Sequence, residues 1–270
     1  MGIIDELIKE LSKGLIPEKY DEEFFRKYLA FRLKTNRIEP VKYPHIPDIK
    51  KLVGIERQKE IVVGNTRQFV KGLPANDILL WGAKGTGKSS LVKALLDIFG
   101  NEGLRIIQIN KSEIPELAQL YEILRDKHQR FILFFDDLSF EPHDDAFRIL
   151  KSLMDGDVEE RPGNVLVYAT TNRRHLIPDT EENGKFPEET LQERISLVER
   201  FGIRVQFPPM DKKLYLKSVE TYLREYGIKV NEEIERESLK WATERGSFSG
   251  RTAYQFVKDF IGKVKVRESS

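Results

Sequence analysis

The amino-acid sequence predicts an α/β fold in which a parallel five-stranded sheet carries helices on both faces. Between residues 55 and 207, short apolar segments alternate with segments of helical periodicity. Such alternation favours parallel strands joined by covering helices. From Pro208 onward the strand pattern stops and only helical periodicity remains. We therefore expect three parts: an N-terminal helical extension and linker at 1–50, the α/β unit at 51–208, and a small helical lid at 209–270.

The first 50 residues are predicted to form helices followed by an extended linker. Apolar residues recur at helical spacing over 4–12 and 18–34. The segment 39–51 contains Pro40, Pro44 and Pro47 and has little periodicity, which is typical of an extended connection. A domain boundary is therefore expected near residue 50.

The α/β unit is expected to contain five strands, each a short apolar run, separated by helices. We place the strands at 77–81, 104–109, 131–136, 165–170 and 203–207, and the helices at 55–71, 89–99, 113–127, 144–154 and 189–200. In the lid, helices are expected over 211–226, 231–244 and 250–262. Asp211 and Asn231 are the expected N-caps of the first two, because their side chains can accept hydrogen bonds from a first helical turn.

Composition excludes several classes of protein. The chain of 270 residues has a formal net charge of +1, which argues against a polyanion-binding field over the whole surface, although a local basic patch stays possible. It contains no cysteine, so it has no disulfide, zinc–thiolate site or thiol nucleophile. No apolar run has the length of a membrane-spanning helix, and the start MGIIDELIKE does not resemble a secretory signal. We expect a cytoplasmic protein without a membrane partner.

A glycine-rich turn joins the strand at 77–81 to the next helix and has the spacing of a phosphate-binding loop. Glycines allow successive N–H groups to face an anion, and the helix N-terminus adds its own donors. Lys88 is expected to reach the β- and γ-phosphates, and the Ser89 hydroxyl to ligate Mg²⁺. The predicted ligands are ATP and Mg²⁺, held by Gly82, Ala83, Lys84, Gly85, Thr86, Gly87, Lys88, Ser89 and Ser90.

Polar side chains end two further strands at the same edge of the predicted sheet. The apolar run FILFF is followed by Asp136 and Asp137. Asp136 is placed to hold the magnesium ion, and Asp137 to orient and deprotonate an attacking water molecule. The run VLVYA ends in Thr171 and Asn172, which are placed to hydrogen-bond the γ-phosphate or that water.

From Val53 to Lys263 the order of these elements resembles that of the AAA+ ATPases. A phosphate loop, an acidic strand end, a polar strand end, the segment ERF at 199–201 and a helical lid follow one another in both. The segments LLWGAKGTGKSSLVKAL, FDDLSFE, YATTNRRHLIP and RGSFSGR further resemble one bacterial AAA+ subfamily catalogued as a domain of unknown function. The resemblance implies an ATPase that assembles into homo-oligomers through its nucleotide site.

The resemblance also implies roles for individual residues. Asn172 matches the first nucleotide sensor, and Arg251 matches the second sensor in the lid. Arg200 matches the arginine finger that acts on a neighbouring subunit; Arg204 competes for this role, but strand alternation places it on a sheet face. In LVGIERQ, residues Leu52 and Val53 match the segment that receives the adenine.

One position departs from the family pattern. The catalytic residue after the magnesium aspartate is usually glutamate, but here it is Asp137. The carboxylate then lies about 1.5 Å further from its water molecule, and a misplacement of about 1 Å can reduce a rate roughly 100-fold. We therefore expect slow hydrolysis, and Glu141, four residues later, is an alternative general base.

Three functions follow from these observations. The first is an oligomeric ATPase that remodels or loads a macromolecular client, which the sequence does not identify. The second is an ATP-dependent binding switch with little turnover. The third is a DNA-associated loader or initiator; the cluster Arg173, Arg174 and His175 is a candidate contact for nucleic acid or another partner, and the acidic insertion 178–190 is either a partner loop or a surface excursion.

Overall fold

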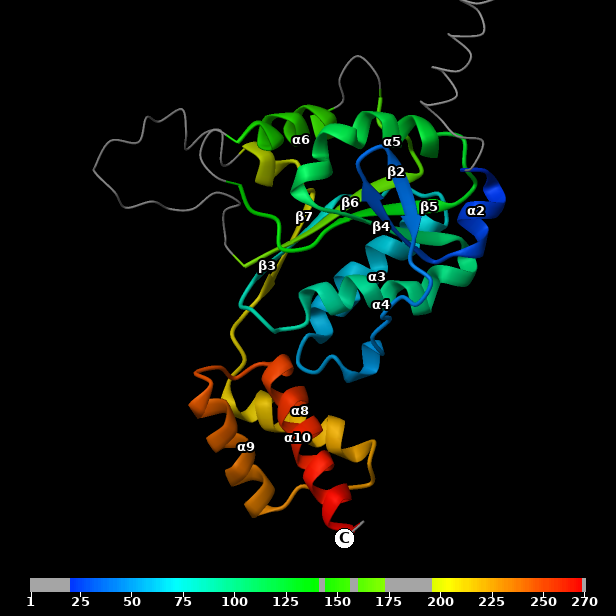
Figure 1. The fold of residues 1–270 in the computed structure, drawn as a ribbon. Coiled ribbons are helices and arrows are strands. Elements are labelled where there is room, and N and C mark those ends of the chain that lie inside the picture. Colours follow the sequence, from blue (N-terminus) through cyan, green and yellow to red (C-terminus); the bar gives the residue numbers. More distant parts are fainter. Residues whose placement is uncertain (1–19, 141–143, 156–159, 173–195, 269–270) are drawn as a thin grey trace, which may run out of the picture.

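A computed structural model describes residues 20–140, 144–155, 160–172 and 196–268. Figure 1 shows two units, an α/β unit that contains the sheet and a bundle of the last three helices. The expected helix at 4–12 lies outside the described residues. No helix within these four ranges is long and apolar enough to span a bilayer.

The strands described by the structure form one seven-stranded sheet in the order β2-β1-β4-β5-β6-β3-β7. The five expected strands are present close to their predicted positions, and all pair in parallel. Their order brings the ends of β3, β5 and β6 to one edge. The strands are β1 (Ala30–Lys34), β2 (Arg37–Pro40), β3 (Ile78–Gly82), β4 (Leu104–Ile109), β5 (Arg130–Phe135), β6 (Val165–Thr171) and β7 (Ile203–Phe207).

The expected helix over 18–34 is wrong, and the sheet has two strands more than predicted. The structure has a short helix α2 (Glu22–Lys27), followed by the antiparallel hairpin β1–β2, in which β1 pairs in parallel with β4. The β1–β2 hairpin therefore belongs to the sheet, although it lies before the predicted domain boundary near residue 50. The division of the chain into 1–50, 51–208 and 209–270 otherwise stays a prediction.

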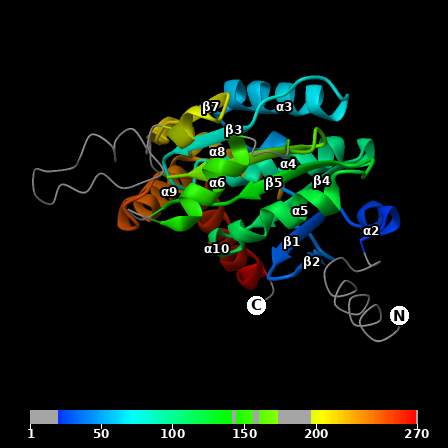
Figure 2. The ribbon, with the colours of Figure 1, turned by 90° about the horizontal axis from the view of Figure 1, so that it is seen from above.

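Helices cover both faces of the sheet (Figures 1 and 2). One face packs α5 (Leu117–Leu124) and α6 (Asp145–Asp155) against side chains such as Leu133 and Phe135, and the other packs α3 (Glu56–Val70) and α4 (Lys88–Phe99) against side chains such as Phe134. Successive residues of β5 thus enter different cores, as strand alternation requires. The predicted α/β fold with helices on both faces is confirmed.

The C-terminal bundle consists of α8 (Lys212–Arg224), α9 (Glu232–Glu244) and α10 (Gly250–Glu268) around its own apolar core. Both expected N-caps are confirmed, because the Asp211 and Asn231 side chains accept hydrogen bonds from Leu214 N and Ile234 N. The bundle also contacts the α/β unit: Gly250 N donates to the carbonyl oxygen of Gly85 at 3.0 Å. The C-terminal bundle therefore contacts the glycine-rich loop directly.

Candidate nucleotide-binding site

The glycine-rich loop leaves β3 and enters α4 through backbone conformations that favour glycine. Gly82, Gly85 and Gly87 have φ values of +130°, +73° and +99°. A Cβ atom on Gly82 would lie 2.1 Å from the carbonyl oxygen of Phe207, so no larger residue fits without a shift of the backbone of β7. The loop therefore has the open backbone that a phosphate cradle requires.

Lys88 lies within this loop and is 6% exposed. Its Nζ atom donates hydrogen bonds to the carbonyl oxygens of Gly82 (2.8 Å) and Ala83 (2.7 Å) and to Asn172 Oδ1 (3.1 Å). Burial lowers the pKa of the ammonium from 10.5 to about 8, although the nearby Asp137 and Asp136 carboxylates act in the opposite direction. A bound polyphosphate would add negative charge next to Lys88 and so favour its protonated form.

Asp136 follows β5 and faces the start of α4. Its Oδ1 atom accepts hydrogen bonds from the Ser89 hydroxyl and from Thr170 Oγ1, the latter at 3.0 Å. Lys93 Nζ lies 3.4 Å from Asp136 Oδ2. The predicted pair of magnesium ligands, Ser89 and Asp136, is thus brought into direct contact.

Asp137 is held beside Asp136 in an uncommon backbone conformation. Its φ is +60°, in the left-handed region that aspartate tolerates better than most residues. Its N–H donates to Thr170 Oγ1 at 2.9 Å, and Asn172 Nδ2 donates to its carboxylate. Because Asn172 Oδ1 also accepts from Lys88, one amide connects the loop lysine to the second carboxylate.

This donor set fits a nucleotide-bound magnesium ion. The described residues contain no group of three or more His, Asp or Glu side chains that would hold a metal by themselves. Mg²⁺ in phosphate-binding enzymes usually takes only one or two protein ligands and completes its shell with phosphate oxygens and water. One carboxylate and one hydroxyl beside an open phosphate loop are consistent with that mode.

The predicted adenine segment and second sensor also lie near the loop. A Cβ atom on Gly87 would lie 3.7 Å from a Leu52 methyl group and 3.6 Å from Ile55 Cδ1. Val53, the next residue after Leu52, is half-buried. Arg251 stands in the first turn of α10 with its Cβ 3.5 Å from the position that a Cβ on Gly85 would take. The C-terminal bundle thus places the exposed residue Arg251 beside Gly85 of the loop.

The structure does not bring Arg200 to this site within one chain. Arg200 precedes β7, whereas the glycine-rich loop follows β3, and the two strands are parallel. A strand of five residues therefore separates Arg200 from the loop edge, a distance of roughly 16 Å. Arg204 is exposed on β7, as expected for a side chain on a sheet face.

Four predicted features lie outside the described residues: Glu141, the cluster Arg173, Arg174 and His175, the insertion 178–190, and most of the helix expected at 189–200.

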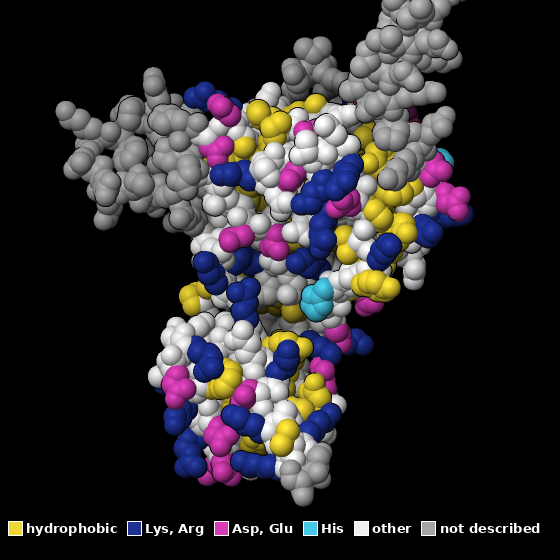
Figure 3. All heavy atoms as spheres, in the orientation of Figure 1, with side chains coloured by type: hydrophobic (Ala, Val, Ile, Leu, Met, Phe, Trp, Pro, Cys, Tyr) yellow, Lys and Arg dark blue, Asp and Glu magenta, His cyan; other side chains and the backbone are white. Residues whose placement is uncertain are grey.

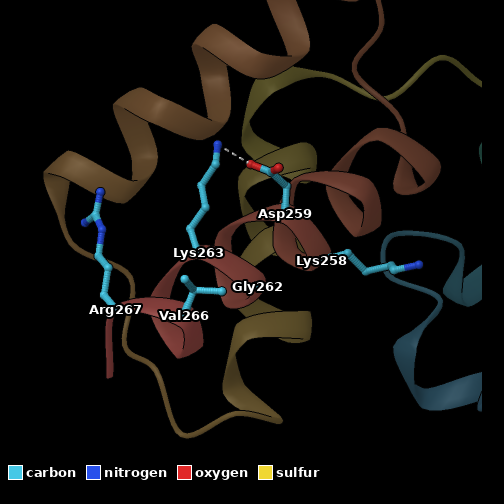
Figure 4. Close-up of a pocket in the computed structure, with 6 residues that line it drawn as sticks. All are labelled: Lys258, Asp259, Gly262, Lys263, Val266 and Arg267. Carbon is cyan, nitrogen blue, oxygen red and sulfur yellow. Dashed lines mark ion pairs between the residues drawn. The ribbon is translucent and has the colours of Figure 1, made fainter. Parts of the chain in front are cut away.

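The surface around the junction of the two units carries many basic side chains. Figure 3 shows Lys and Arg side chains near the narrow waist between the α/β unit and the lid. A separate shallow hollow follows α10 away from the glycine-rich loop and is crossed by the Lys263–Asp259 ion pair of 2.6 Å (Figure 4). None of the predicted site residues lines this hollow, which is formed by Lys258, Asp259, Gly262, Lys263, Val266 and Arg267.

Two residues that contact the site are absent from the sequence prediction. Thr170 is 2% exposed and bonds to both Asp136 and Asp137, and Lys93 lies one helical turn after Ser89 beside Asp136. The i, i+4 spacing of Ser89 and Lys93 is readable in the sequence and is the signal that indicates a shared helix face. For Thr170 no such signal exists, because its contacts depend on the register of β6 beside β5.

Comparison with known proteins gives similarities in both sequence and fold. The model of the family described as "Protein of unknown function (DUF815)" matches residues 26–264. "Chaperone protein ClpB4, mitochondrial" of Arabidopsis thaliana is 25% identical over 208 residues, which are 62% of this chain and 21% of ClpB4. The chain therefore spans about a fifth of the length of this curated relative.

Two solved structures share the fold at low sequence identity. The Aeropyrum pernix Orc1 protein in complex with DNA matches with a TM-score of 0.59 and 18% identity over 82% of this chain and 62% of that chain. The Thermotoga maritima RuvB Holliday junction branch migration motor matches with a TM-score of 0.55 and 16% identity over 82% of this chain and 67% of that chain. The fold is that of the AAA+ P-loop proteins, and the chain belongs to the family described as "Protein of unknown function (DUF815)".

Proposed function

We propose that this protein is an ATPase that binds Mg-ATP on the glycine-rich loop, hydrolyses it slowly, and uses it to remodel or load a macromolecular partner. The observation that carries the proposal is the meeting of Lys88, Asp136 and the Asp137–Asn172 pair at one sheet edge. This edge, at the carboxyl ends of parallel strands, is where α/β sheets bind their ligands.

The residues of the chain suggest a division of work in hydrolysis. Lys88 and the loop N–H groups bind and orient the phosphates, and a magnesium ion held by Ser89 and Asp136 supplies charge neutralisation. Asp137 accepts a proton from a water molecule that attacks the γ-phosphorus, while the bond from that phosphorus to the bridging oxygen breaks and ADP leaves. Asn172 orients Asp137 through the hydrogen bond to its carboxylate.

Slow turnover is proposed for two reasons. The aspartate side chain is one methylene shorter than the glutamate of related ATPases, and the Asp137 carboxylate is already engaged by Asn172. The second reason also favours the alternative of a binding switch, in which occupancy by ATP, rather than turnover, controls a partner. Glu141 stays an alternative base.

The proposed site is completed by a neighbouring subunit. Arg200 is too far from the loop of its own chain to reach a phosphate there, so its proposed role as an arginine finger requires a second copy. A guanidinium delivered in this way stabilises the charge on transferring phosphoryl oxygens and raises rates by about 10³ to 10⁵.

The client of the proposed ATPase is either a nucleic acid or another protein. The similar proteins are an Orc1 protein in complex with DNA, a branch migration motor and a chaperone, which supports both kinds of partner as candidates. DNA that stimulates the ATPase would favour a loader or initiator. A rate that does not respond to DNA would favour a protein client.

Steady-state ATPase measurements with and without DNA, on the parent protein and on Asp137→Asn, test the proposal. We expect magnesium-dependent turnover in the parent, and loss of turnover with retained ATP binding in Asp137→Asn. Full activity in this variant would transfer the role of base to Glu141. Arg200→Ala should slow turnover without weakening ATP binding to the isolated subunit. If this variant leaves assembly and turnover unchanged, the subunit-interface proposal fails.

A further inference from the structure

Thr170 occupies a position from which one side chain can control both carboxylates of the candidate site. It is the penultimate residue of β6, and its side chain is almost fully buried. The pairing of Phe135 with Ala169 places Thr170 beside Asp136, one step beyond the last paired residues of β5 and β6. Thr170 of β6 therefore lies beside the point where β5 ends and the two aspartates, Asp136 and Asp137, begin.

The Thr170 hydroxyl makes two hydrogen bonds of opposite sense. It donates to Asp136 Oδ1 at 3.0 Å and accepts from the N–H of Asp137 at 2.9 Å. The carbonyl oxygen of Thr170 also accepts from the N–H of Leu138 at 2.7 Å. A hydroxyl has one proton to donate and lone pairs to accept, so a single atom fixes the side chain of Asp136 and the backbone of Asp137 together.

The backbone of Asp137 needs such support. A non-glycine residue in the left-handed region persists only where its surroundings determine its conformation. Here the hydroxyl of Thr170 holds the N–H of Asp137, and the carbonyl of Thr170 holds the next N–H. Without the hydroxyl, the amide of Asp137 would lose its partner in a partly buried place, and the peptide would be free to turn the carboxylate away.

We propose that Thr170 is the positioning residue that sets the direction of both carboxylates, aiming Asp136 at the metal and Asp137 at the attacking water molecule. The inference rests on the proposed ATPase function and adds a residue to it. Thr170 touches neither nucleotide nor water in this role, and it acts only through the two aspartates. Since a misplacement of about 1 Å can cost roughly 100-fold in rate, loss of one hydroxyl is expected to be visible in kcat.

The test compares Thr170→Val, which removes the hydroxyl at nearly constant shape, with Thr170→Ser, which keeps it. We expect Thr170→Val to lower kcat roughly 30- to 100-fold with KM for ATP changed less than about 3-fold, and Thr170→Ser to stay within about 3-fold of the parent. Calorimetric titration should show that Thr170→Val requires about 10-fold more Mg²⁺ for the same nucleotide binding, because Asp136 loses a donor that orients it. Thr243→Val is the matched control, since it removes a hydroxyl that bonds only to a carbonyl within α9.

Several outcomes would overturn the inference. A Thr170→Val protein with parental kcat and Mg²⁺ dependence refutes it, and so does a Thr170→Ser protein as impaired as Thr170→Val. If the valine variant does not fold, Thr170→Ser and Thr170→Ala replace the pair, because both lose the methyl group and differ only in the hydroxyl; equal kcat values in these two refute the inference. If the parent itself neither binds nor hydrolyses ATP, the proposed function fails, which is a distinct result.

Discussion

Raising the pH should weaken ATP binding because the Lys88 ammonium loses its proton within an accessible range. Burial lowers the pKa of this group to about 8 in the free protein. Only the charged form attracts the phosphates strongly, and the bound phosphates in turn raise its pKa. At pH 7.5 about three quarters of the molecules carry the ammonium, and at pH 9 about one tenth do. The dissociation constant for Mg-ATP should therefore rise about eight-fold between these values.

Calorimetric titrations from pH 7.5 to 9 measure this change directly. Lys88→Arg is the matched control, because a guanidinium stays protonated throughout the range while fitting the site less well. Its dissociation constant should be higher at pH 7.5 but independent of pH. A parent protein whose affinity is constant up to pH 9 would show that the Lys88 ammonium does not titrate where its burial predicts.

Two further predictions concern the scaffold around the site. Arg105→Met should lower the free energy of unfolding in urea by roughly 3 kcal/mol, because the buried guanidinium donates hydrogen bonds to four carbonyl oxygens, those of Phe25, Arg26, Gly100 and Leu104. A loss below about 1 kcal/mol would mean that these carbonyls find other donors. Gly82→Ala should abolish ATP binding, since its Cβ would lie 2.1 Å from the carbonyl oxygen of Phe207. Gly64→Ala, in the open middle of α3, should retain binding and stabilise the protein by roughly 0.5 to 1 kcal/mol. Parental ATP affinity in Gly82→Ala would contradict the proposed need for glycine in the loop.

The sequence predicts the central sheet well but misses the β1–β2 hairpin. Apolar residues in FFRKYLAFRL satisfy helical spacing over a short stretch, so periodicity alone could not separate a helix from a helix followed by a strand. One local signal was present: Asn36, in the turn between the strands, has a φ of +58°, which asparagine tolerates better than most residues. The partner of β1 is β4, whose paired residues lie 76 positions later in the chain, as for Ala30 and Ile106, and no local pattern indicates that pairing.

The site was predictable where its residues are contiguous in the chain. The glycine-rich loop and the two aspartates could be recognised because each motif is read along one segment. The contacts of Thr170 could not be recognised in this way, because they depend on the register of β6 beside β5. That register is determined by how the side chains on both faces of the sheet pack. The same limit applies to the contact between Gly85 and Gly250, which joins the loop to a lid helix that follows much later.

Calorimetric titration of Mg-ATP into the parent protein and into Lys88→Ala shows whether this chain binds the nucleotide through its loop lysine. We expect saturable binding of about one nucleotide per chain in the parent, and affinity reduced by roughly 100-fold or more in the variant, because the charge that binds the phosphates is gone. Absence of binding in the parent, or equal binding in both proteins, would contradict this expectation.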